Sequence, residues 1–116
     1  MKKPTQCVLW EKPELIDASM KDCLELVETF VDDSHLWRHL FKCRECGQLY
    51  FYEFYEEVDW VGGDDAQYVK YIPVETAEEI EALKKASILE IFQFLPQLQK
   101  DFPTGAKKVS IGWVGK

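Results

Sequence analysis

The middle of the chain constrains the fold most strongly, because it reads as three strand-like segments separated by short turns. Residues 36–43 (LWRHLFKC) alternate between two faces, and residues 48–56 (QLYFYEFYE) are dense in the aromatic side chains that pleated sheets favour. The intervening RECG is short enough for a tight hairpin, and VGGDD at 61–65 is a turn whose glycines can adopt positive φ. Residues 67–74 (QYVKYIPV) form the third segment. The pattern predicts antiparallel strands.

Helical patterns flank these segments. Apolar residues recur at spacings of three and four through residues 17–31, which predicts an amphipathic helix. Thr76 and Glu79 form a capping box that opens a second helix. Ser87 and Glu90 have the same spacing and predict that a further helix follows.

Two outer segments complete the prediction of the fold. Residues 7–10 (CVLW) and the alternating residues 108–114 (KVSIGWV) read as short strands. We therefore expect one domain spanning residues 1–116, with an α+β fold. Its core is a mainly antiparallel sheet of three to five strands with helices packed on one face.

The charge of the chain is concentrated in one region. Lys and Arg number 14 against 21 Asp and Glu, which gives a net charge of −7 over 116 residues. Residues 45–69 contain no Lys or Arg and carry all of this excess. A negative field disfavours nucleic acids and anionic membrane surfaces as partners and favours a basic protein.

The same region is rich in aromatic residues, a mixture that is found at tight protein interfaces. We expect a partner-binding surface here, made of Tyr52, Glu53, Tyr55, Glu56, Glu57, Asp59, Trp60, Asp64 and Asp65. The alternative is a solvated hairpin end whose charges keep an edge strand from pairing. A metal site formed by Asp59, Asp64 and Asp65 is a weaker option, since their spacing does not match an EF-hand.

The sharpest local motif is Cys43-Arg-Glu-Cys46-Gly47. A CxxCG turn between two strands resembles the knuckle of zinc ribbons and rubredoxins, in which backbone amides point at the thiolates. The resemblance implies a zinc site, although a second CxxC is missing. We expect the ligands to be Cys43, Cys46 and His39, joined by either Cys7 or Cys23. The alternative is a coincidental turn with reduced thiols.

Redox chemistry and catalysis find less support in the sequence. A thioredoxin-type CxxC starts a helix, whereas a strand pattern follows this one. No enzyme motif occurs, and His39 alternates with apolar residues in the manner of a core histidine. We therefore expect a protein that is not an enzyme.

The small size and the acidic character of the chain resemble those of bacterial immunity proteins, which neutralise cationic nuclease toxins. This resemblance implies an inhibitor that covers a basic active site. The alternative function is a small structural zinc-binding module of the ribbon type. The chain has no apolar run of membrane-spanning length and no signal-like start, so we expect a soluble, cytoplasmic protein.

Overall fold

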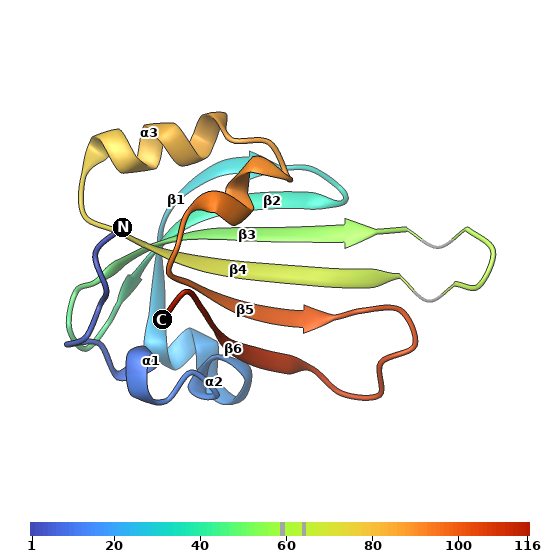
Figure 1. The fold of residues 1–116 in the computed structure, drawn as a ribbon, viewed down its shortest axis with the longest axis horizontal. Coiled ribbons are helices and arrows are strands. Elements are labelled where there is room, and N and C mark those ends of the chain that lie inside the picture. The colour runs from blue at the N-terminus through green and yellow to red at the C-terminus, as the bar shows by residue number, and fades with distance from the viewer. Residues whose placement is uncertain (59, 64) are drawn as a thin grey trace.

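A computed structural model describes residues 1–58, 60–63 and 65–116. It contains one antiparallel sheet of six strands, in which each strand pairs with the next one along the chain (Figure 1). The strands are β1 Leu24–Asp32, β2 Leu36–Cys43, β3 Leu49–Glu57, β4 Ala66–Val74, β5 Gln97–Phe102 and β6 Ser110–Val114. The helices are α1 Val8–Glu11, α2 Leu15–Cys23, α3 Ala77–Lys85 and the 3₁₀ turn η1 Glu90–Gln93.

The prediction for the middle of the chain is confirmed. Strands β2, β3 and β4 lie within one residue of the segments that alternation and aromatic content indicated. Helix α3 also begins as predicted, since the Thr76 hydroxyl accepts from the Glu79 amide at 3.2 Å and the Glu79 carboxylate accepts from the Thr76 amide. Signals from neighbouring residues in the sequence were sufficient to predict these elements.

The predicted helix over residues 17–31 is wrong in its second half. Helix α2 ends at Cys23, and the chain continues directly as β1. The pairing of β1 with β2 is interrupted by irregularities between Leu26 and Glu28 and between Thr29 and Val31. Each irregularity adds a residue to the strand and breaks its period of two, so the apolar spacing imitates that of a helix.

The predicted fold class is also wrong, in the number of strands and in the placement of the helices. The sheet has six strands rather than three to five, because neither the irregular β1 nor the polar β5 (QLQKDF) carries an alternation signal. Residues 7–10, expected as a strand, contribute to the short helix α1. The helix expected after Ser87 is only the turn η1, although the predicted bonds between Ser87 and Glu90 form at 2.9 and 3.1 Å.

Helical segments cover both faces of the sheet and not one (Figure 1). On one face, α1 and α2 pack through Leu9 and Ile16 against the sheet. On the other face, α3 and η1 pack through Leu83 and Ile91. Two separate apolar cores result, and the middle strands are buried on both sides.

The hairpin between β3 and β4 extends beyond the neighbouring strands at the end of the sheet away from α1 and α2 (Figure 1). Its two strands pair from Leu49 and Val74 to Glu57 and Ala66. The acidic, aromatic region therefore lies largely on this hairpin. In the described part of the chain, no helix has the length and apolar character needed to cross a membrane.

Candidate metal centre and partner-binding surface

Three cysteines from two distant parts of the sequence meet at one end of the sheet. Cys7 directly precedes α1, Cys43 ends β2, and Cys46 lies in the turn between β2 and β3. Their Sγ atoms all lie within 4.8 Å of one another. Cys7 and Cys43 are buried, whereas Cys46 is exposed. All four cysteines belong to the described residues, and none of them forms a disulfide. The three clustered cysteines could bind a metal ion.

The CxxCG turn is closed by a backbone hydrogen bond and contains a glycine in the left-handed region. The Gly47 amide donates to the Cys43 carbonyl at 2.9 Å, and Gly47 adopts a φ of 82°, which a glycine reaches without strain. Burial acts to raise the pKa of the Cys43 thiol, but hydrogen bonds from the Cys46 and Glu45 amides, together with those from the Cys46 and Cys7 thiols, outweigh it, so that the pKa is lowered overall. These amides are placed to stabilise a thiolate at Cys43.

Tyr50 lies beside the cysteine cluster. Its side chain is fully buried, and its hydroxyl has no hydrogen-bond partner of good geometry, although the Cys7 thiol lies beside it. Burial raises the pKa of the Cys7 thiol to about 12, against a smaller lowering by contact with Tyr50. Burial also raises the pKa of Tyr50. A buried hydroxyl without a partner is uncommon and calls for an explanation.

His39, which was expected to be a ligand, is not among the three clustered residues. Its Nδ1 lies 3.1 Å from the Thr29 hydroxyl, and its ring stacks on Tyr52 with 5.4 Å between centroids. Burial lowers the pKa of His39. Of the two cysteines expected as alternatives for the remaining ligand, Cys7 belongs to the cluster and Cys23 stands outside it.

The expected partner-binding residues do not form a single surface. Side chains alternate along β3, so Tyr52 and Glu56 point to the face of α1 and α2, whereas Glu53, Tyr55 and Glu57 point to the face of α3. Glu53 is fully buried, and Tyr52 is 8% exposed. Neither side chain offers area to a partner without rearrangement of the fold.

The hairpin tip carries the most exposed residues of the region. Trp60 is 89% exposed and Val61 is 100% exposed, while Glu57 is exposed and Asp65 is half-buried. Asp59 and Asp64 lie outside the described residues. Large exposed apolar side chains beside carboxylates are consistent with a contact surface.

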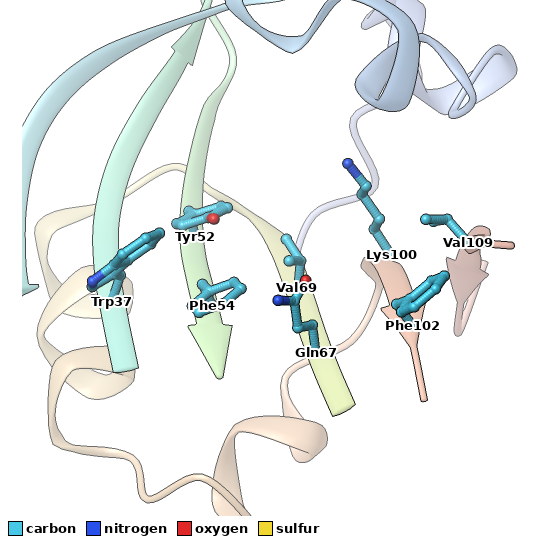
Figure 2. Close-up of a pocket in the computed structure, with 8 residues that line it drawn as sticks. All are labelled: Trp37, Tyr52, Phe54, Gln67, Val69, Lys100, Phe102 and Val109. Atoms are coloured by element: carbon cyan, nitrogen blue, oxygen red, sulfur yellow. The ribbon is translucent and has the colours of Figure 1, made fainter. Parts of the chain in front are cut away.

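A pocket of about 440 Å³ lies beside the half of this hairpin nearer its turn, on the face of α1 and α2. Figure 2 shows its side chains along β2, β3, β4 and β5 and on the segment that leads into β6. Aromatic and aliphatic groups form most of the lining, namely Trp37, Tyr52, Phe54, Val69, Phe102 and Val109. The rings of Trp37 and Phe54 stack with centroids 4.7 Å apart.

One expected carboxylate is connected to this pocket. Gln67, which lines it, donates to Glu56 Oε2 at 3.2 Å, and His35 Nδ1 lies 3.0 Å from Glu56 Oε1. Hydrogen bonds from Gln67 and then His35 lower the pKa of Glu56. The other polar lining residue, Lys100, pairs with Asp17 of α2 at 3.2 Å. An apolar floor beside a charged carboxylate suits an aliphatic cation.

Sequence reasoning did not choose Cys7 over Cys23 and did not find Tyr50 or the pocket in Figure 2. Alternation along β2 and β3 was the available signal for the pocket, because it places Trp37, Tyr52 and Phe54 on one side. The contribution of β5 depends on strand order, which the sequence left open. Comparisons with protein-family models, with curated proteins and with solved structures found no match.

Proposed function

We propose that this chain is a small zinc-binding module in which Cys7, Cys43 and Cys46 hold a structural zinc ion. The observation that carries the proposal is that the three Sγ atoms lie within 4.8 Å of one another. They do so although Cys7 precedes Cys43 by 36 residues in the sequence. Thiolates are soft ligands that favour zinc over calcium or magnesium. Three protein thiolates leave one position of a tetrahedral ion for a further donor.

The surroundings of the cluster support this donor set. The Cys46 and Glu45 amides stabilise a thiolate at Cys43, as the knuckle resemblance implied. The Tyr50 hydroxyl lacks a partner while Cys7 is a thiol, and a metal-bound Cys7 thiolate would accept its hydrogen. Thus one bound ion accounts both for the clustered thiols and for the unpaired hydroxyl.

A structural ion also fits the position of the site in the fold. Cys7 belongs to the N-terminal segment, whereas Cys43 and Cys46 belong to the β2–β3 hairpin. Zinc would tie this segment to the sheet. A reducing compartment such as the cytoplasm would keep the thiols available for the metal.

Metal analysis of the purified protein tests the proposal. We expect one equivalent of zinc, with strongly reduced content after Cys43→Ser and unchanged content after Cys23→Ser. Cys23 is the matched control because it stands outside the cluster. A folded sample that neither contains zinc nor takes it up under reducing conditions would rule out the zinc function.

A second candidate function is the binding of a basic protein partner, as the resemblance to immunity proteins implies. The pocket in Figure 2 favours it, because an aromatic floor lies near the Glu56 carboxylate. We propose that a lysine or arginine of the partner packs its stem against Trp37 and Phe54 and directs its charge toward Glu56. The exposed Trp60 at the hairpin tip would add contact area.

The product of the gene next to this one is the partner to test, since an immunity gene lies beside that of its toxin. With Glu56→Lys, we expect slower association and a weaker dependence on salt. The control, Glu78→Lys, reverses one charge on α3, away from this pocket. Equal association rates for the wild type and for both variants at low and high salt would contradict this function.

A further inference from the structure

Three charged side chains lie in register across the sheet beneath α3 and η1. Arg38 of β2 pairs in register with Glu53 of β3, which pairs with Lys70 of β4. Their exposed fractions are only 5%, 0% and 1%. Buried charges are costly unless each one is paired and hydrogen-bonded, so each member of this row needs its partners identified.

Arg38 is well satisfied. Its Nε and Nη2 lie 2.9 and 2.7 Å from Glu53 Oε2, and its Nη1 donates to the carbonyls of Leu83 and Lys84 at the end of α3. The pair of Arg38 and Glu53 is therefore neutral. Arg38 contacts only Oε2 of the Glu53 carboxylate, so Glu53 Oε1 has no hydrogen bond.

Lys70 has no comparable partner. Its Nζ lies 3.8 Å from Glu53 Oε1, which is beyond hydrogen-bond distance, and 4.3 Å from the centroid of the Phe92 ring. Among the described residues, no hydrogen bond accepts a proton from Nζ. An ammonium group carries three donors, so the most deeply buried lysine of the protein has unused hydrogen-bonding capacity.

Lys70 lines a cavity of about 400 Å³ between the sheet and the η1 segment. The other walls are mostly apolar and aromatic, being formed by Tyr55, Tyr68, Ile88, Leu89 and Phe92. Tyr55 and Tyr68 stack with centroids 6.5 Å apart. A mostly apolar cavity with a few polar groups, here Lys70 and Glu57, is the usual form of a small-molecule site.

The surrounding charges indicate what kind of acceptor Lys70 can take. Against the cations Arg38 and Lys70 stand Glu53, the Asp101 carboxyl that attracts Lys70, and Glu57 in the lining of the cavity. Three carboxyl groups therefore oppose two cations. An anionic ligand would add to this excess of negative charge. An uncharged oxygen would accept a hydrogen bond from Lys70 Nζ without that electrostatic cost.

We propose that this cavity binds a small uncharged molecule with an aromatic or aliphatic body and one carbonyl oxygen. The carbonyl accepts a hydrogen bond from Lys70 Nζ, and the body packs between the tyrosine pair and Phe92. This site lies on the face of the sheet opposite to the pocket in Figure 2 and is independent of the zinc centre.

Titration with simple probes, followed by NMR of the backbone amides, tests the proposal. Phenylacetamide is the uncharged carbonyl probe, phenylacetate the anion and phenethylamine the cation. We expect phenylacetamide to bind most tightly and to shift the amides of Tyr55, Tyr68 and Phe92. Absence of these shifts at millimolar phenylacetamide, or tighter binding of either charged probe, would overturn the assignment.

Substitution at the floor of the cavity tests the role of the lysine. Lys70→Met should weaken phenylacetamide binding about tenfold, whereas Lys12→Met, at an exposed lysine that follows α1, should leave it unchanged. If Lys70→Met does not fold, Phe92→Ala provides the second test, because Phe92 is 47% exposed and forms a wall of the cavity. Unchanged affinity in a folded Lys70→Met or Phe92→Ala protein would contradict the proposal.

Discussion

At the scale of single residues, the unpaired hydroxyl of Tyr50 connects the cysteine cluster to the core. We predict that Tyr50→Phe lowers zinc affinity about 10- to 100-fold, the usual effect of removing a hydrogen bond to a metal ligand. Competition with a chromophoric chelator measures this change. The reason is that the Cys7 thiolate would lose the donor that lies beside it in the folded protein.

Tyr52 provides the control for this experiment. It lies two residues further along the same strand and on the same face, but it lines the pocket in Figure 2 and not the cysteine cluster. Tyr52→Phe should leave zinc affinity unchanged. If the two substitutions alter the affinity equally, the effect comes from general loosening of the core and the role of Tyr50 is refuted.

His39 gives the fold a dependence on pH. Burial lowers its pKa below the ordinary value of 6.5, so the unfolded chain binds the proton more readily than the folded one. Stability is therefore fully present above pH 6.5 and falls as the pH decreases toward the lowered pKa of the folded state. We predict that His39→Gln removes this part of the acid destabilisation, as measured by Tm between pH 8 and pH 5.

His35 is the matched control, since it is an exposed histidine at the start of the same hairpin. In the His35→Gln variant, the fall of Tm with decreasing pH that is caused by His39 should persist. An identical fall of Tm with pH in the wild type and in His39→Gln would show that His39 does not contribute.

At the scale of elements, Arg38 joins β2 and β3 to the end of α3. We predict that Arg38→Met destabilises the fold by about 3–5 kcal/mol, because it leaves the Glu53 carboxylate buried without its main partner. Chemical denaturation measures the change. Adding Glu53→Gln to this variant should recover part of the loss, since it removes the buried negative charge.

An exposed arginine provides the comparison. Arg44 lies 3.6 Å from Glu25, with about half of each side chain exposed, and Arg44→Met should cost less than about 1 kcal/mol. If Arg38→Met were as mild as Arg44→Met, the buried row would not hold α3 on the sheet.

The elements also differ in how far the sequence defined them. β2, β3 and the start of α3 follow from alternation, aromatic content and a capping box, which are all local signals. β1 and β5 do not. The irregularities of β1 disturb its period, and β5 is held by its pairing with β4 rather than by its own residues.

At the scale of the whole molecule, the proposed zinc ion would fix the N-terminal segment to the sheet. We predict that chelation, or Cys7→Ser, increases amide exchange in α1 and α2 while β3 and β4 stay protected. Hydrogen exchange followed by mass spectrometry measures this pattern. The two helices also contact the sheet through Leu9 and Ile16. We therefore expect α1 and α2 to become more mobile while the rest of the protein stays folded.

The same measurement contains its own control. Cys23→Ser lies in α2 but outside the cluster, so the exchange of α1 in this variant should remain that of the wild type. Uniform loss of protection across all six strands after chelation would show that the ion supports the entire fold rather than the N-terminal segment.

The sequence by itself determined the central strands, the cap of α3, the location of the excess charge and the CxxCG turn, because each depends on neighbouring residues. Only the tertiary structure decided which distant cysteine joins Cys43 and Cys46, since covalent order does not encode distance. It also divided the acidic, aromatic region between two faces and buried Glu53 beside Arg38. The reason is that strand order and the positions of the helices depend on packing across the whole sheet, which no short segment specifies.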